Sequence, residues 1–200
     1  MKVLSLCDGM SCGRIALEKA GINVEKYFAS EIKKIAIKVT NYNYPDTIQI
    51  GDVRKIKYEN GILYTEVGNF KTDIDMVIWG SPCQSFSVAM KSTKRIGLAD
   101  KERSGLFFEC YRIFQEVRPS WFLMENVANM RTHDREFISS LLGVTPIRIN
   151  SSLVSAALRD RFYWTNIPNI TPPEDRHILL QDILISGYTD RLKARALLAS

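Results

Sequence analysis

The chain has 200 residues, of which 46% are hydrophobic and 24% charged, and its formal net charge is +5. This composition is typical of one soluble globular domain and argues against an intrinsically disordered chain. Every apolar run is shorter than the eighteen or so residues of a membrane-spanning helix, and the short apolar start does not match a signal peptide.

The cysteines and histidines give little sign of a metal centre. The four cysteines form no CxxC pair, and there are only two histidines. We therefore predict reduced thiols, a cytoplasmic protein and no bound metal. The positive net charge favours a polyanionic partner only mildly.

The first segment reads as a strand, a glycine loop and a helix. An apolar strand is predicted over residues 2–7, followed by the loop Asp8-Gly9-Met10-Ser11-Cys12-Gly13 and a helix to Ala20 that stops at Gly21. This arrangement brings backbone N–H groups close to a ligand, as in nucleotide-binding βαβ units, although many ordinary βα turns look similar.

An acidic residue follows each of the next two predicted strands. Glu31 comes after residues 24–30, and Asp52 comes after residues 47–50. Glu31 suits ribose hydroxyl groups, and Asp52 suits the amino group of an adenine. Either residue alone is better explained as a loop or helix-capping carboxylate. Together, after a glycine loop, they favour an adenosyl ligand.

Between these strands, apolar residues at helical spacing predict a helix with one apolar face. They are Ile32, Ile35, Ala36 and Val39. Residues 54–74 are charged and turn-rich, and no regular element is predicted there.

The central predicted strand, residues 75–79, runs into Gly80-Ser81-Pro82-Cys83-Gln84-Ser85. Proline stiffens this turn, which places Cys83 at the carboxyl end of a buried strand, where ligands bind in α/β sheets. Cys83 is therefore a candidate nucleophile. The alternative is a small buried core residue.

Residues 85–104 show no periodicity and predict a long loop, a kind of segment that is often functional. It combines five basic residues with two acidic ones, which suits a nucleic-acid backbone, whereas each lysine taken separately is equally typical of a solvated loop. The basic residues are Lys91, Lys94, Arg95, Lys101 and Arg103.

The second half continues the alternation of helices and strands. A helix is predicted over 106–117, with Cys110 in the core, and a buried strand over 121–124 that ends in Glu125. A carboxyl group after so apolar a run is partly desolvated and usable as an acid. A helix over 137–142 and a strand over 145–149 follow.

Arg159 and Arg161 precede an aromatic strand over residues 162–164. Alternation along an extended chain puts both side chains on one side, where they either clamp an anionic group or a base edge or lie as surface charges beside an edge strand. Residues 168–200 are loop-like, with a short helix predicted over 179–185.

The residues at the predicted strand ends combine an adenosyl pocket with a thiol, an acid and a cation. These groups suit methylation of carbon 5 of cytosine, in which a thiolate adds to carbon 6 while an acid holds ring nitrogen 3. Such a target is shielded in a duplex and has to be flipped out.

The ordered motifs resemble those of the cytosine carbon 5 DNA methyltransferases, including phage enzymes and animal de novo enzymes. They are Asp8-Gly9-Met10-Ser11-Cys12-Gly13, Ser30-Glu31, Gly51-Asp52-Val53, Gly80-Ser81-Pro82-Cys83-Gln84, Glu125-Asn126-Val127 and Arg159-Asp160-Arg161. The resemblance implies an α/β, Rossmann-like class I S-adenosylmethionine-dependent methyltransferase fold, with a mostly parallel sheet and helices on both faces. It implies a catalytic domain over 1–167 and a linker over 168–200.

The resemblance also implies roles for single residues, with S-adenosylmethionine as methyl donor, S-adenosylhomocysteine as product, and no metal. Cys83 matches the nucleophile, Glu125 the acid at nitrogen 3, and Arg159 and Arg161 the groups near the flipped base. The cofactor-binding residues would be Asp8, Gly9, Met10, Gly13, Glu31, Ile32, Asp52, Val53, Ser81, Pro82 and Leu106. The DNA-binding residues would be Gln84, Ser85, Ser87, Lys91, Lys94 and Arg95.

Three departures from the family pattern bear on activity. Cys7 stands where a phenylalanine is frequent, and Ala157 where a glutamine is frequent. The chain also ends before the target-recognition region and the final segments, so we expect an incomplete catalytic core whose recognition region lies beyond residue 200 or on a separate chain. Double-stranded DNA is the expected substrate, in a bacterial or phage-infected cell. A non-catalytic scaffold subunit and a transfer RNA methyltransferase are the alternatives.

Overall fold

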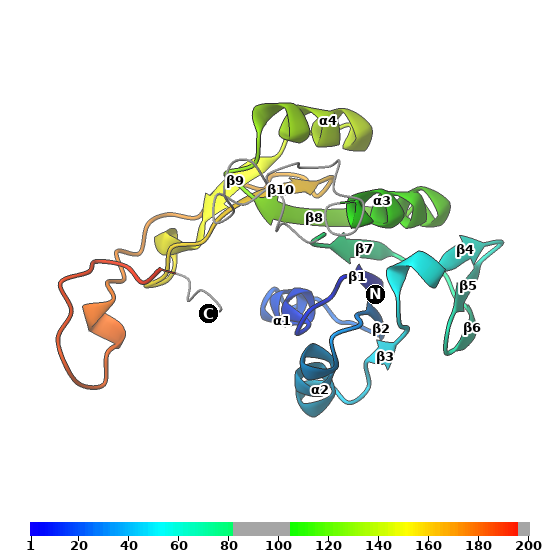
Figure 1. Cartoon of the computed structure of the whole chain (residues 1–200), viewed down its shortest axis with the longest axis horizontal. Coiled ribbons are helices and arrows are strands. Elements are labelled where there is room, and N and C mark those ends of the chain that lie inside the picture. Colours follow the sequence, from blue (N-terminus) through cyan, green and yellow to red (C-terminus); the bar gives the residue numbers. More distant parts are fainter. Residues whose placement is uncertain (82–104, 196–200) are drawn as a thin grey trace.

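The computed structural model describes residues 1–81 and 105–195. In this part of the chain a seven-stranded sheet forms the centre, with strand order β3-β2-β1-β7-β8-β10-β9 (Figure 1). The pairs among β1, β2, β3, β7 and β8 are parallel, and β10 is antiparallel to both β8 and β9. The strands are β1 (Lys2–Leu6), β2 (Lys26–Ser30), β3 (Ile48–Gln49), β7 (Met76–Trp79), β8 (Trp121–Val127), β9 (Ile147–Asn150) and β10 (Asp160–Thr165).

The strand order creates a switch point beside β1. The chain runs outward from β1 through β2 to β3, then returns to place β7 on the opposite side of β1. Open α/β sheets bind ligands at the carboxyl ends of the strands at such a point. This topology confirms the predicted α/β fold class and puts the glycine loop, Glu31, Asp52 and Gly80 at one edge of the sheet.

Helices cover both faces of the sheet because side chains alternate along each buried strand. Leu4 and Leu6 contribute to the larger core with α3 and α4, whereas Val3 packs with Leu17 of α1 on the other face. Cys110 is fully buried in the larger core, as predicted. The helices are α1 (Cys12–Lys19), α2 (Lys34–Asn43), α3 (Leu106–Val117) and α4 (Thr132–Leu142).

The predicted apolar face over residues 32–39 is wrong in part. Ala36 and Thr40 are the buried residues of α2, while Ile32 and Ile35 are 61% and 79% exposed. Both isoleucines lie beside a cleft rather than in the core. Apolar spacing does not distinguish a residue that faces the core from one that lines a binding site.

Residues 57–71 form a second, three-stranded antiparallel sheet that the sequence analysis missed. Its strands are joined in the order β4-β5-β6, and Leu63 and Phe70 pack against the main core. Asn60 and Gly61 join β4 to β5 with positive φ angles of 52° and 75°, the conformation that Asn-Gly favours in a tight hairpin. This dipeptide was the available sequence signal. The strands are β4 (Lys57–Glu59), β5 (Ile62–Thr65) and β6 (Gly68–Lys71).

The carboxyl-terminal segment is mostly irregular. Instead of the predicted helix over 179–185 there is one 3₁₀ turn, Gln181–Ile183, because Ile183 and Ile185 are exposed and have no core to pack against. The Lys193 ammonium group donates to three backbone carbonyls at 2.6 to 3.0 Å, two of which belong to residues 152 and 155. This lysine therefore joins the segment to the chain just before β10.

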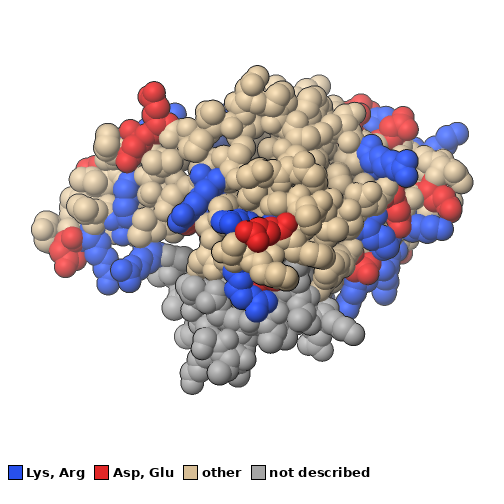
Figure 2. All heavy atoms as spheres, turned by 90° about the horizontal axis from the view of Figure 1, so that it is seen from above, with Lys and Arg blue, Asp and Glu red and all other residues tan. Residues whose placement is uncertain are grey.

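Charge is distributed rather than concentrated on the face shown in Figure 2. Charged side chains of both signs lie at both ends of the molecule, and most of the surface between them is uncharged. The described part of this face thus shows no broad surface of a single sign. Within the described residues, no helix is long and apolar enough to cross a membrane.

Candidate cofactor and catalytic site

A cleft of about 900 Å³ opens at the carboxyl edge of the sheet. It lies at the switch point and is bounded by the ends of β1, β2 and β7 and by the first residues of α2 and α3. Seven of the predicted cofactor-binding residues line it: Gly9, Met10, Glu31, Ile32, Asp52, Val53 and Leu106.

Glu31 joins the glycine loop to the start of α2. Its Oε2 atom accepts from the Gly9 N–H at 2.8 Å, and its Oε1 atom accepts from the N–H groups of Ile32 and Lys33 at 2.8 and 2.9 Å. A carboxylate has about four acceptor positions, so one remains, on Oε2. Glu31 therefore fixes the loop and still offers an acceptor to a ligand hydroxyl group.

Asp8 and Gly13 belong to the glycine loop but do not line the cleft. The Asp8 carboxylate accepts from the Ser11 hydroxyl at 2.5 Å and from the Tyr27 hydroxyl at 2.8 Å. Burial, and then the charge of Asp8, raise the pKa of Tyr27, so this hydroxyl stays protonated and donates. A Cβ at Gly13 would lie 3.3 Å from the Tyr27 hydroxyl oxygen. Both residues therefore contribute to the conformation of the glycine loop without lining the cleft.

Asp52 is paired with Arg54, a cleft residue that the sequence analysis did not single out. The Arg54 Nε atom donates to both carboxylate oxygens at 3.0 Å, and the Arg54 backbone N–H donates to Oδ1 at 3.0 Å. The Asp52 side chain is 14% exposed. The Arg54 guanidinium group also donates from Nη2 to Oδ2 at 2.5 Å and holds the pKa of Asp52 below its usual range. Asp52 is therefore an anion whose acceptor positions are taken by Arg54, and a ligand amino group would replace part of this pairing.

This pairing predicts that Asp52 contributes to the acid sensitivity of the fold. A carboxyl group whose pKa is lowered by folding stabilises the folded chain above its unfolded pKa of about 3.9, and the stabilisation is lost as the pH falls through the folded value. In Asp52→Asn, the free energy of unfolding should therefore depend less on pH between about pH 5 and pH 3. Urea unfolding across this range measures the effect, with the exposed Asp190→Asn as matched control. Equal pH dependence in both variants would contradict the assignment.

Glu125 lies within β8, two residues before the end of that strand rather than directly after it as predicted, and between two arginines and a glycine. Its Oε1 atom is 2.6 Å from Arg161 Nε and 3.3 Å from Arg159 Nη2. Both arginines therefore lie on one side of the strand, as predicted, and β10 is an interior strand rather than an edge. A Cβ at Gly80 would lie 3.2 Å from Glu125 Oε2. Since Gly80 also lines the cleft, the carboxylate and the cleft adjoin.

Ser81, two residues after the end of β7, is held by a side chain of β8. Ser81 is buried outside the cleft, where the Asn126 amide donates to its backbone and side-chain oxygens at 3.4 and 3.3 Å. The remaining predicted site residues lie outside the described part of the chain. They are Pro82, Cys83, Gln84, Ser85, Ser87, Lys91, Lys94 and Arg95.

The side chains around the cleft fit a nucleoside. Two carboxylates accept from hydroxyl or amino groups, while Met10, Val53 and Leu106 supply apolar surface for a planar base. Glu31 and Asp52 thus provide hydrogen-bond acceptors after two different strands, and the three apolar side chains line the same cleft. An adenosyl group presents donors and an apolar ring in this same combination.

Comparison with protein families gives one match, to the C-5 cytosine-specific DNA methylase model, over residues 1–143. Type II methyltransferase M.NgoBV of Neisseria gonorrhoeae is 38% identical over 149 residues, which are 72% of this chain and 32% of that protein. Type II methyltransferase M.NlaIV of Neisseria lactamica is 37% identical over 180 residues, 88% of this chain and 39% of that protein. The chain thus spans about a third of the length of these relatives.

Two further similarities come from mobile elements. Orphan methyltransferase M.SPRI of Bacillus phage SPR is 29% identical over 170 residues, 84% of this chain and 35% of that protein. Among solved structures, a candidate DNA modification methyltransferase encoded within a prophage (E. coli) superposes with a TM-score of 0.62 at 25% identity. That match covers 82% of this chain and 46% of the other.

Proposed function

The chain belongs to the C-5 cytosine-specific DNA methylase family, and we propose that it methylates carbon 5 of a cytosine flipped out of double-stranded DNA. The observation that carries this proposal is the position of Glu125, next to Gly80 at the cleft and bonded to two arginines. The nucleophile assigned by the sequence, Cys83, follows Gly80 by three residues.

We propose S-adenosylmethionine as the methyl donor in the cleft. Glu31 would accept from a ribose hydroxyl group through its remaining lone pair, and Asp52 would accept from the adenine amino group. Met10, Val53 and Leu106 would contact the adenosyl moiety. When bound, this cofactor supplies an electrophilic methyl group to carbon 5.

In the proposed mechanism the Cys83 thiolate attacks carbon 6 of the cytosine. A carbon–sulfur bond forms at carbon 6, the electrons of the 5,6 double bond shift through carbon 4 toward nitrogen 3, and nitrogen 3 takes a proton from the protonated form of Glu125. After methylation, carbon 5 loses its proton to a base. The electron pair then restores the 5,6 double bond, the thiolate leaves, and the proton on nitrogen 3 returns to Glu125.

The two arginines fix Glu125 for this step. Both guanidinium groups approach Oε1, while Oε2 lies on the side of Gly80. Arg161 has a side chain only 17% exposed and therefore holds one position, whereas Arg159 is 60% exposed and free to reach the oxygen of the base. We assign orientation of the acid to Arg161 and contact with the base to Arg159.

We further propose that residues 1–167 form the catalytic unit and that residues 168–200 lead toward a target-recognition region, on further sequence or on a separate chain. The length of the relatives supports this division, because the chain spans about a third of them. The predicted DNA contacts at Gln84, Ser85, Ser87, Lys91, Lys94 and Arg95 belong to the same proposal.

Transfer of a labelled methyl group to DNA tests the proposed function. The chain is incubated with labelled S-adenosylmethionine and duplex DNA, alone and with the carboxyl-terminal part of M.NlaIV in trans. We expect label in 5-methylcytosine. Label in another base, or label in transfer RNA but not in DNA, would contradict the proposal.

Glu31→Ala should weaken S-adenosylhomocysteine binding by about 10- to 100-fold, because it removes an acceptor to a ribose hydroxyl and releases the N–H of Gly9. Isothermal titration calorimetry measures this affinity. Glu25→Ala is the matched control, since it removes an exposed glutamate before the opposite end of β2 and should bind as the unchanged chain does. Equal affinities in the two variants would remove Glu31 from the site.

A further inference from the structure

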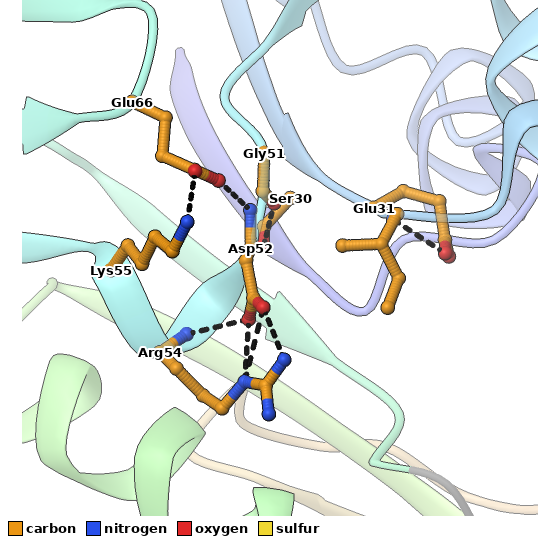
Figure 3. Close-up of polar contacts among 8 residues, drawn as sticks. Ser30, Glu31, Gly51, Asp52, Arg54, Lys55 and Glu66 are labelled. Carbon is orange, nitrogen blue, oxygen red and sulfur yellow. Dashed lines mark hydrogen bonds and ion pairs between the residues drawn. The ribbon is translucent and has the colours of Figure 1, made fainter.

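The peptide unit between Gly51 and Asp52 is held at both of its polar atoms (Figure 3). The Ser30 hydroxyl donates to the Gly51 carbonyl oxygen at 2.8 Å, and the Asp52 N–H donates to Glu66 Oε2 at 3.0 Å. Ser30 is the last residue of β2, and Glu66 lies in the turn between β5 and β6. Two elements far apart in the sequence thus fix the peptide plane that precedes Asp52.

Glycine at position 51 makes this contact possible. Its φ angle is +80°, and a Cβ there would lie 2.6 Å from Glu66 Oε2. Two atoms cannot stay at this Cβ–oxygen distance, so a side chain at position 51 would displace the Glu66 carboxylate. The positive φ angle would also strain the backbone of any other residue there. The close approach of Glu66 to this peptide therefore depends on the glycine.

Glu66 is itself restrained. Its Oε1 atom accepts from the Lys55 ammonium group at 2.5 Å, and this contact lowers the pKa of Glu66 and raises that of Lys55. The small sheet that carries Glu66 is anchored in turn, since Leu63 is fully buried in the main core. Glu66 does not line the cleft, so it would act on a ligand only through Asp52.

We propose that Glu66 is a positioning residue for cofactor recognition: it orients the Gly51–Asp52 peptide so that the Asp52 carboxylate meets the adenine amino group. This inference rests on the proposed function, which places adenine beside Asp52. If so, the small sheet over residues 57–71 fixes the conformation of the adenine-binding segment at Asp52 through Glu66, which itself lies outside the cleft.

The test compares two ligands that differ at the adenine amino group. Affinities for S-adenosylhomocysteine and for its inosine analogue, which has a carbonyl there, are measured by calorimetry. In Glu66→Ala, we expect the preference for the adenosine ligand to fall about three- to tenfold, because one oriented hydrogen bond is lost. Affinity for the inosine analogue should stay within about twofold. A general loss of structure would weaken both ligands equally.

Three further variants distinguish a role of Glu66 in positioning Asp52 from a contribution of Glu66 to the stability of the fold. Glu66→Gln keeps an oxygen for the Asp52 N–H and should restore most of the preference. Glu59→Ala removes another glutamate of the small sheet that is ion-paired to a lysine at 2.9 Å, and it should leave the preference unchanged. The double variant Asp52→Ala/Glu66→Ala should lose no more preference than Asp52→Ala alone, because Glu66 acts through Asp52.

The outcomes distinguish this inference from the function on which it rests. If the unchanged chain binds S-adenosylhomocysteine and Glu66→Ala keeps its full preference for adenosine, only the role of Glu66 is overturned. The same holds if Glu59→Ala reduces the preference as much as Glu66→Ala. If the unchanged chain binds neither ligand, the proposed cofactor site fails, and the inference fails with it.

Discussion

Replacement of Cys83 by serine is expected to reduce methyl transfer to DNA by at least about 10³-fold. A serine hydroxyl is far less ionised than a thiol at neutral pH and is a poor nucleophile toward carbon 6 of cytosine. Affinity for S-adenosylhomocysteine should stay within about twofold, because the sulfur is assigned to the base and not to the cofactor. Initial rates with labelled cofactor, together with calorimetry, measure the two effects separately.

Cys12→Ser is the matched control for this change. Cys12 is an exposed cysteine at the first position of α1, and it does not line the cleft. Its replacement should leave both the rate and the affinity nearly unchanged. If Cys83→Ser retained the rate of Cys12→Ser, another group would have to be the nucleophile.

Glu125→Gln is expected to reduce methyl transfer by about 10²- to 10⁴-fold, the usual contribution of a positioned general acid. Glutamine has nearly the same shape and still offers an oxygen to Arg159 and Arg161, but it has no acidic proton for nitrogen 3. The loss should appear mainly in kcat, since the interaction strengthens as charge develops on the ring. Single-turnover rates at saturating DNA measure it.

The control for Glu125 is Glu136→Gln on α4. Glu136 also pairs with an arginine, Arg135, at 3.7 Å, but it does not line the cleft. This variant should keep the full rate. A Glu125→Gln chain that methylates DNA at the control rate would exclude Glu125 as the acid.

The alternation of strands and helices was predictable because each buried element carries a local apolar pattern. Residues 106–117 show this most clearly, since the predicted helix coincides with α3. The positions of Glu31, Asp52 and Glu125 followed from one rule, that parallel strands end at the same edge of a sheet. Local pattern and topology together were therefore enough to place the acidic residues of the site.

The partners of those residues were not predictable in the same way. Arg54 lies two residues from Asp52 and its contact is local, but the spacing alone does not tell which of the neighbouring basic side chains, Arg54 or Lys55, pairs with the carboxylate. Glu66 acts through a contact with the Asp52 N–H that exists only once the small sheet has packed on the core. The predicted helix over 179–185 failed for the opposite reason, because its apolar residues have no surface to pack against. Tertiary placement, not local propensity, decided the cases of Glu66 and of this helix.

The central claim is that one cysteine forms a covalent bond to a flipped cytosine beside an acid and a methyl donor. Trapping with duplex DNA that carries 5-fluorocytosine tests it most directly, because fluorine cannot leave carbon 5 as a proton does. The chain is used alone and with the carboxyl-terminal part of M.NlaIV in trans, with S-adenosylmethionine present. We predict an adduct that survives denaturing electrophoresis, maps to Cys83 by peptide mass spectrometry and is absent from Cys83→Ser. An adduct of equal yield in Cys83→Ser, or none with the unchanged chain in either mixture, would contradict the account.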